Sequence, residues 1–180
     1  NGQLLAEVNG NGTVIAQYIY LNGQPVAVAT EPAAPPIRMM DTLAEANRMG
    51  STSGQLTDQS NASATKESGE PNHAGNSGGH SVWTTYTSYT TGTLTIDTCG
   101  SDFDTLLAVY QGEDMATLTE VASNDDDSSC GTGSKVSFQV ETGQTYRIAV
   151  DGKNGATGNI ELQWSYLGNP VDGEVPLPLW

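Results

Sequence analysis

The 180-residue chain carries 21 acidic and 6 basic residues, which gives it a net charge of −15. So negative a chain is excluded as a binder of nucleic-acid phosphates, which requires a basic face, and is disfavoured at an anionic membrane surface. The sequence has no run of 18 apolar residues, so we expect no membrane insertion of this segment.

The first 29 residues contain three short apolar runs separated by Asn-Gly turn signals. The runs cover residues 3–8, 13–20 and 25–29, with NGNG at 9–12 and NG at 22–23 between them. Asn-Gly between apolar runs is typical of β-hairpins, so the pattern predicts a three-stranded β-meander. This segment resembles one unit of the YD (Rhs-type) repeats of large bacterial surface proteins. Because the chain starts inside this pattern, we expect it to be a piece of a longer protein.

The meander has apolar residues on both faces and no element in its own segment that covers them. A lone three-stranded sheet is marginally stable in water, and open strand edges pair with other chains. We therefore predict that the meander joins copies of the chain head to tail, which produces a fibre when the contacts do not close. The alternative is a meander that folds back onto its own domain and leaves the chain monomeric. The residues expected to carry the self-association are Leu4, Leu5, Val8, Val14, Ile15, Tyr18 and Ile19.

Residues 30–60 read as a linker between two ordered parts. The Pro-rich stretch 30–36 (TEPAAPP) predicts an extended backbone. Residues 37–49 predict one short helix, with several apolar residues roughly on one face and Gly50 as its stop. Residues 51–80 are rich in Ser, Gly, Asn and Thr and predict a loop with at most one short strand.

From residue 81 onward apolar and polar residues alternate, which is the period of a half-buried β-strand. Turn residues separate the runs, and no helical pattern intervenes. This spacing predicts an all-β domain, an antiparallel β-sandwich or jelly roll. The stretch 105–110 is apolar almost throughout, which indicates a strand buried on both faces. The seven runs lie near 82–86, 93–97, 105–110, 117–123, 136–140, 146–150 and 160–166.

Three motifs in the predicted sandwich resemble the bacterial pre-peptidase C-terminal domain. They are SDFDT at 101–105, NDDD at 124–127 and GQTY at 143–146, and the resemblance covers about residues 61–167. It implies a non-catalytic β-sandwich attached to secreted enzymes and surface proteins. Some members of that family bind calcium, and others bind extracellular polymers. The end of the chain, 168–180, resembles a VPLP-type bacterial sorting tail, with a plain Pro-rich tail as the alternative.

Cys99 and Cys130 are the only cysteines in the chain. Two cysteines form a structural zinc site only if histidines join them, and His73 and His80 lack the usual pair spacing. A reactive thiol needs positive neighbours, whereas aspartates flank both cysteines. We therefore predict a disulfide between them, which places the chain in an oxidising compartment, extracellular or at the cell surface.

A cluster of carboxylates flanks the two cysteines, and the disulfide would bring their loops to one end of the sandwich. Converging carboxylates repel one another unless a cation binds, and oxygen ligands of this kind suit Ca²⁺. The cluster therefore predicts a calcium site. The alternatives are a solvated acidic surface or aspartates that cap turns. The predicted ligands are Asp102, Asp104, Asp125, Asp126 and Asp127.

The sequence offers no convincing catalytic motif. Residues 75–79 (GNSGG) match the G-x-S-x-G pattern, but a nucleophile elbow follows a strand and opens a helix. Here Glu70-Pro71 precedes the motif and a strand pattern follows it, so it predicts a Gly-rich turn. We expect a non-catalytic structural or adhesive module whose partners are copies of itself. The alternative is a polysaccharide- or polymer-binding module from a secreted hydrolase.

Overall fold

The computed structural model describes residues 3–8, 14–21, 24–29, 37–50 and 52–168. The chain forms two compact units, residues 1–36 and residues 37–180. The stretch 30–36 of the predicted linker and residues 169–180 of the predicted sorting tail lie outside the described residues. Among the helical segments described, none has the length and hydrophobicity that crossing a bilayer requires.

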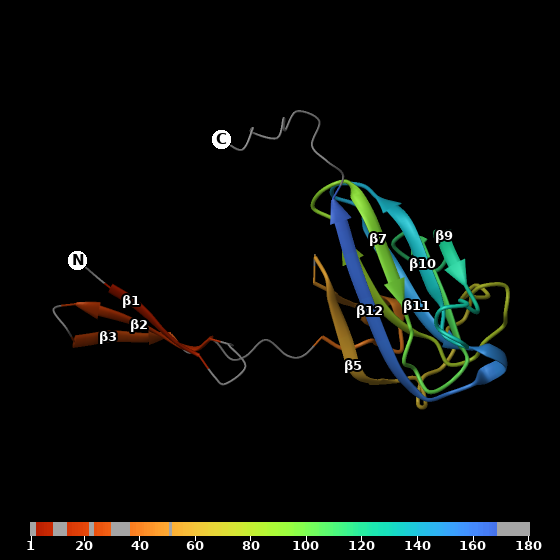
Figure 1. Cartoon of the computed structure of the whole chain (residues 1–180), viewed down its shortest axis with the longest axis horizontal. Coiled ribbons are helices and arrows are strands. Elements are labelled where there is room, and N and C mark those ends of the chain that lie inside the picture. The colour runs from red at the N-terminus through yellow and green to blue at the C-terminus, as the bar shows by residue number, and fades with distance from the viewer. Residues whose placement is uncertain (1–2, 9–13, 22–23, 30–36, 51, 169–180) are drawn as a thin grey trace, which may run out of the picture. The chain divides into compact units, whose positions relative to one another are not determined.

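The first unit is a three-stranded antiparallel sheet in the order β1-β2-β3 (Figure 1). Its strands are β1 (Gln3–Val8), β2 (Val14–Leu21) and β3 (Gln24–Ala29). The sheet confirms the predicted meander. Its register sets Leu5 opposite Tyr18, and Tyr18 opposite Val28. The side chains of the residues predicted to self-associate lie outside the described part of the structure, so only their backbone positions are known.

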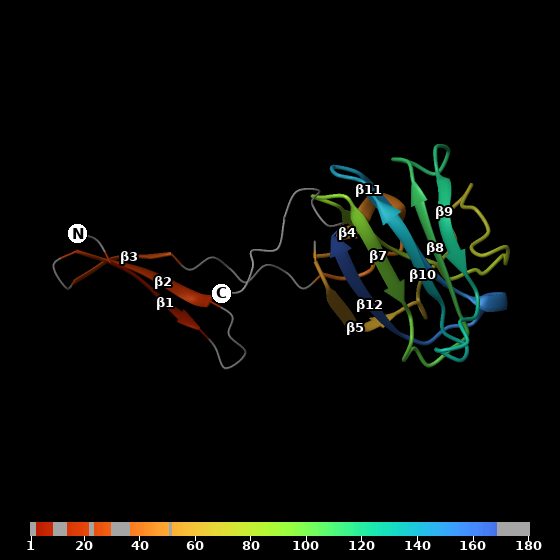
Figure 2. The ribbon, with the colours of Figure 1, turned by 45° about the horizontal axis from the view of Figure 1, so that its top comes forward.

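The second unit is a sandwich of two sheets (Figures 1 and 2). One sheet has the order β10-β7-β12-β5 and the other the order β4-β6-β11-β8-β9. All neighbours are antiparallel except β4 and β6. This confirms the predicted all-β sandwich, and each of the seven predicted runs forms a strand. The strands are β4 (Asn47–Arg48), β5 (Gly54–Ser60), β6 (Val82–Thr87), β7 (Gly92–Asp97), β8 (Thr105–Gln111), β9 (Thr119–Asn124), β10 (Lys135–Val140), β11 (Thr145–Gly152) and β12 (Asn159–Gly168).

The main core lies between the two sheets. Because side chains alternate across a strand, every second residue of β7, β10 and β12 points inward, while those between them face solvent. The opposing sheet contributes alternate residues of β6, β8 and β11 to the same core. Fully buried examples from the two sheets are Leu94, Ile96, Ile160, Leu162, Leu107, Val109, Ile148 and Val150.

A second, smaller core lies on the outer face of the five-stranded sheet. It is built from Trp83 of β6, Ala108 and Tyr110 of β8, and Ala149 of β11, with Leu43 packed over them. This cover makes every residue of 105–110 buried, which confirms the prediction of a strand buried on both faces. The ring of His73, discussed below, contacts Trp83 and Tyr110 of this smaller core.

The helix predicted over residues 37–49 is wrong. The segment runs extended beside β6, where Met40 and Trp83 exchange two backbone hydrogen bonds of 2.9 and 2.7 Å. Its only helical turn is η1, a 3-10 turn of three residues at Leu43–Glu45. The extended path pairs the backbone groups at the edge of β6, which a helix cannot do. It also buries three apolar side chains, those of Met39, Leu43 and Met49.

The sandwich also begins earlier than the predicted boundary at residue 61. Strand β5 pairs with β12 at the edge of the four-stranded sheet, so residues 37–60 belong to the second unit rather than to a linker. Within β5 only Leu56 and Gln59 are buried. Between them the pairing slips, and Asp58 takes a positive φ of 57°. Because of this bulge, buried and exposed residues do not alternate along β5, so the sequence shows no strand pattern there.

Candidate functional site

The strand register brings the predicted site residues to one end of the sandwich. Thr105, the first residue of β8, lies opposite Gly152, the last residue of β11. In the other sheet, Asp97 at the end of β7 lies opposite Lys135 at the start of β10. The loops that carry the two cysteines and the predicted calcium ligands therefore all leave the sheets at this end.

Cys99 and Cys130 form a disulfide, as predicted, with their Cα atoms 4.9 Å apart. The bond joins the segment after β7 to the loop between β9 and β10. Three fully buried hydroxyl residues support the same loop: Thr98 Oγ1 lies 2.6 Å from Thr105 Oγ1, which lies 3.1 Å from Ser134 Oγ. The loop is thus held both by a covalent bond and by a buried hydrogen-bond network.

Three of the five predicted calcium ligands converge. Carboxylate oxygens of Asp104, Asp125 and Asp126 all lie within 4.8 Å of one another. The Nζ atom of Lys153, which follows β11, lies 2.9 Å from Asp125 Oδ2, 3.2 Å from Asp126 Oδ2 and 3.8 Å from Asp104 Oδ2. Sequence reasoning missed this lysine, although its position three residues beyond the predicted strand run 146–150 was visible.

The charges of this acidic group are only partly compensated. Burial raises the pKa of the Asp104 carboxyl, and repulsion from Asp126 and Asp125 adds to that rise while Lys153 opposes it. Hydrogen bonds to Asp125 and Asp126 raise the pKa of the Lys153 ammonium, which therefore stays charged at neutral pH. The Oδ1 atoms of Asp104 and Asp125 are buried and have no hydrogen-bond partner. Two acceptor atoms are thus left available to a second cation.

The other two predicted ligands make hydrogen bonds outside this group. Asp102 Oδ1 accepts a 2.7 Å bond from the backbone N–H of Asn159, and its Oδ2 accepts a 2.8 Å bond from the Asn159 side chain. Asp127 Oδ1 accepts a 2.9 Å bond from the backbone N–H of Ser129. The Ser129 hydroxyl donates to the same oxygen, and these two hydrogen bonds lower the pKa of Asp127. Both carboxylates hold turns, which is the role that the alternative interpretation assigned to such aspartates.

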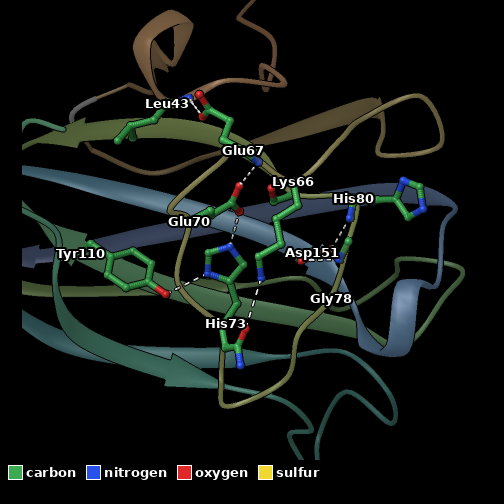
Figure 3. A network of polar contacts seen from close by, with 12 residues as sticks. Leu43, Lys66, Glu67, Glu70, His73, Gly78, His80, Tyr110 and Asp151 are labelled. Atoms are coloured by element: carbon green, nitrogen blue, oxygen red, sulfur yellow. Dashed lines mark hydrogen bonds and ion pairs between the residues drawn. The ribbon is translucent and has the colours of Figure 1, made fainter. Parts of the chain in front are cut away.

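A second polar cluster, which the sequence did not reveal, lies in the loop between β5 and β6 (Figure 3). His73 Nε2 lies 2.7 Å from Glu70 Oε1, and His73 Nδ1 lies 2.8 Å from the hydroxyl of Tyr110 on β8. The side chains of Glu70 and His73 are fully buried. The imidazole also packs edge-on against the rings of Trp83 and Tyr110, at centroid distances of 5.4 and 5.7 Å. The Glu-x-x-His spacing at 70–73 was the only local signal.

The hydrogen bonds of this cluster attach the loop between β5 and β6 to Tyr110 of β8. Burial tends to raise the pKa of the Glu70 carboxyl, but hydrogen bonds from His73, Ser81 and the backbone N–H of Glu67 outweigh it, so the pKa is lowered. Burial raises the pKa of the Tyr110 hydroxyl. A neutral imidazole can donate from Nε2 to the carboxylate while Nδ1 accepts from the tyrosine, which satisfies both ring nitrogens of His73. Because His73 has no exposed surface, it holds the loop and cannot reach a substrate.

The Gly-rich stretch 75–79 wraps around one buried carboxylate rather than presenting a nucleophile. Asp151 accepts hydrogen bonds from the backbone N–H groups of Gly79 at 3.0 and 3.1 Å and of His80 at 2.8 Å (Figure 3). Gly78 has a positive φ of 54°, and a Cβ atom there would overlap the Asp151 carboxylate. This position therefore requires glycine. The stretch forms a turn, as the sequence predicted.

No protein-family model and no curated protein matches the sequence. The resemblances to the pre-peptidase C-terminal domain and to YD repeats remain predictions that rest on the motifs quoted above.

Proposed function

We propose that the chain is a non-catalytic structural or adhesive module of a secreted or surface protein, and that it joins copies of itself head to tail through β1–β3. One observation carries this proposal. Residues 3–29 form a sheet in a compact unit of their own, and β1 and β3 each have only one strand neighbour among the described strands. Edges of this kind add strands from other chains unless they are protected.

The sandwich offers an acceptor for such a strand. Strand β5 is seven residues long and pairs only with β12 among the described strands. At the other side of the sandwich, the edge strands β9 and β10 are linked by a 3.0 Å hydrogen bond from Lys135 N to Asn124 Oδ1. Strand addition to β5 would join the meander of one copy to the sandwich of the next, with main-chain hydrogen bonds supplying the affinity.

Removal of residues 1–29 is expected to abolish self-association. The full chain should sediment as species that grow with protein concentration, whereas the truncated chain should remain a monomer. Because residues 37–180 form a compact unit, the truncated chain keeps the sandwich and its disulfide. Sedimentation velocity and electron microscopy measure the difference. Polymers that survive the deletion, or a full chain that stays monomeric at high concentration, would contradict the proposal.

Point substitutions separate edge pairing from a general charge effect. Leu5→Lys with Val28→Lys places lysines on the two edge strands of the meander, and edge lysines oppose strand addition. We expect this variant to be monomeric. Ser128→Lys with Thr132→Lys adds the same charge at exposed positions of the β9–β10 loop and should leave the polymer intact. Equal loss in both variants would assign the effect to charge alone.

We further propose that Asp104, Asp125 and Asp126 bind Ca²⁺ in place of the Lys153 ammonium. The two unpartnered buried Oδ1 atoms support this proposal, because they are oxygen acceptors that the lysine does not reach. Three carboxylates in mono- or bidentate contact, completed by water, satisfy the ligand preference of Ca²⁺. Such a site would resemble those of weakly binding extracellular modules.

Calcium at about 10 mM is expected to stabilise the chain by roughly 1–3 kcal/mol, which corresponds to a rise in Tm of about 2–12 °C. Chelator should reverse the rise. Asp104→Asn with Asp125→Asn should abolish the response, whereas Glu45→Gln with Glu141→Gln removes two exposed carboxylates elsewhere and should preserve it. Differential scanning calorimetry checks the result. A Tm that calcium leaves unchanged would mean that Lys153 is the permanent counter-ion of the group.

A further inference from the structure

A polar pocket of about 250 Å³ opens at the end of the sandwich opposite the disulfide. It lies between the loop after β8 and the turn that leads into β11, where Tyr110 lies opposite Arg147 in the strand register. The pocket is somewhat smaller than the roughly 300–1,000 Å³ of sites for drug-sized molecules, so it suits one small ring. Its lining residues are Gln111, Gly112, Glu113, Gly143, Gln144, Thr145 and Arg147.

The backbone positions one cation in this pocket. Arg147 Nε donates a 3.2 Å hydrogen bond to the carbonyl oxygen of Gly112, and this bond orients the planar guanidinium. Gly112 itself has a φ of 125°, and a Cβ atom there would lie 2.6 Å from the carbonyl oxygen of Thr117. The loop conformation that presents this carbonyl therefore requires glycine. The two terminal amino groups of Arg147 have no hydrogen-bond partner among the described residues.

Arg147 forms no ion pair, as holds for every Lys and Arg of the described residues except Lys153. No carboxylate oxygen of the described residues lies within 4.0 Å of the Arg147 guanidinium, although Glu113 lines the same pocket. The side chains of Gln111, Glu113 and Gln144 also make no hydrogen bond with the described part of the chain. The pocket thus gathers the two unpartnered terminal amino groups of a half-buried arginine, two side-chain amides and one carboxylate.

We propose that this pocket binds a sugar acid, a pyranose ring that bears one carboxylate. The end of the guanidinium fork matches a carboxylate in a bidentate pair. The amides of Gln111 and Gln144 can donate to and accept from ring hydroxyls, and the Glu113 carboxylate can accept from one. A neutral sugar would leave the arginine unpaired, and a small carboxylate without hydroxyls would leave the amides and Glu113 unused.

The site is independent of the self-association proposed above. None of its residues belongs to β1–β3 or to the edge strand β5, and it lies at the other end of the sandwich from Asp104 and Lys153. The chain with residues 1–29 deleted should therefore bind the sugar acid as the full chain does. If the chain is instead a polysaccharide-binding module, the alternative function, this pocket would bind a uronic acid unit of an extracellular polysaccharide.

The experiment is a titration of ¹⁵N-labelled protein with glucuronate, galacturonate, glucose and acetate, followed by amide NMR shifts. We expect saturable shifts at Gly112, Gly143 and Gln144 with a Kd of about 1 mM for at least one of the two sugar acids. Glucose and acetate should each bind at least about tenfold more weakly. Equal binding of glucose or of acetate, or no saturation by either sugar acid at about 10 mM, overturns the proposal.

Two variants test the arginine directly. Arg147→Gln should abolish the glucuronate and galacturonate shifts, and Arg147→Lys, which keeps the charge but loses the fork, should weaken binding at least about tenfold. Arg48→Gln removes the same charge from an exposed arginine that contacts Tyr89, and it should bind like the unaltered chain. Undiminished binding by Arg147→Gln would overturn the assignment. The comparison of sugar acid with glucose on the unaltered chain decides the matter even if a variant fails to fold.

Discussion

Replacing His73 with alanine is expected to lower the free energy of unfolding by about 3–5 kcal/mol, because a buried carboxylate loses its hydrogen-bond partner and a large buried side chain is removed. The substitution leaves the Glu70 carboxylate and the Tyr110 hydroxyl buried without their 2.7 and 2.8 Å partner, and it opens a space beside Trp83. Urea denaturation followed by tryptophan fluorescence measures the change. Trp83 lies in the affected cluster, so its emission should also report local solvent entry.

His80→Ala is the matched control for this prediction. The His80 ring is partly exposed and makes one 2.7 Å contact, with the carbonyl oxygen of Ala64, so its loss should cost only about 1 kcal/mol. If His73→Ala costs no more than His80→Ala, the buried cluster does not hold the loop between β5 and β6 onto the sheet.

The same cluster predicts a loss of stability in acid. Because the pKa of Glu70 is lowered on folding, the unfolded chain binds the proton more readily, and the contribution of this carboxylate is complete above its ordinary pKa of 4.5. The contribution falls as the pH drops below 4.5 and is lost once the pH passes the folded-state pKa. Glu70→Gln removes this ionisation, so its stability should change less over that range than that of Glu141→Gln, an exposed control. Parallel pH profiles would contradict the assignment.

Replacing both cysteines with serine is expected to lower the free energy of unfolding by about 3–4 kcal/mol. The disulfide closes a loop between residues 31 positions apart, and its removal gives the unfolded chain back the entropy that this closure withholds. A reductant should destabilise the unaltered chain by a similar amount and leave the double-serine variant unchanged. Thiol titration of the denatured, unreduced protein should find no free thiol. Two reactive thiols would remove the main argument for an exported protein.

The local pattern of the sequence was sufficient for most of the strands. The side chains of a half-buried strand alternate between core and solvent, so apolar and polar residues alternate along its sequence. Strand β10, with its inward Val136, Phe138 and Val140, is the clearest case. Asn-Gly turns likewise predicted the meander of residues 3–29. The disulfide followed by elimination from the chemistry of the two cysteines and their acidic neighbours.

Where burial depends on distant segments, the local pattern failed. Residues 37–49 have a weak helical pattern, but the open edge of β6 offers Met40 two backbone hydrogen bonds, and the sheet prevails over propensity. In β5 a bulge at Asp58 breaks the alternation, so its pairing with β12 was not visible. In both places the strand that the fold places alongside decided the structure: β6 for residues 37–49, where a helix was predicted, and β12 for β5, in a stretch predicted to be mostly loop.

The sequence by itself determined which residue types this protein has for a site, and the tertiary structure decided which of them meet. Five aspartates near two cysteines were evident, but only the register of β8, β9 and β11 brings three of them together around Lys153. The contact between His73 and Tyr110 spans 37 positions, and the pocket around Arg147 joins two loops of the same sheet. Such groupings depend on how strands align across the sheets, and no short stretch of sequence contains that information.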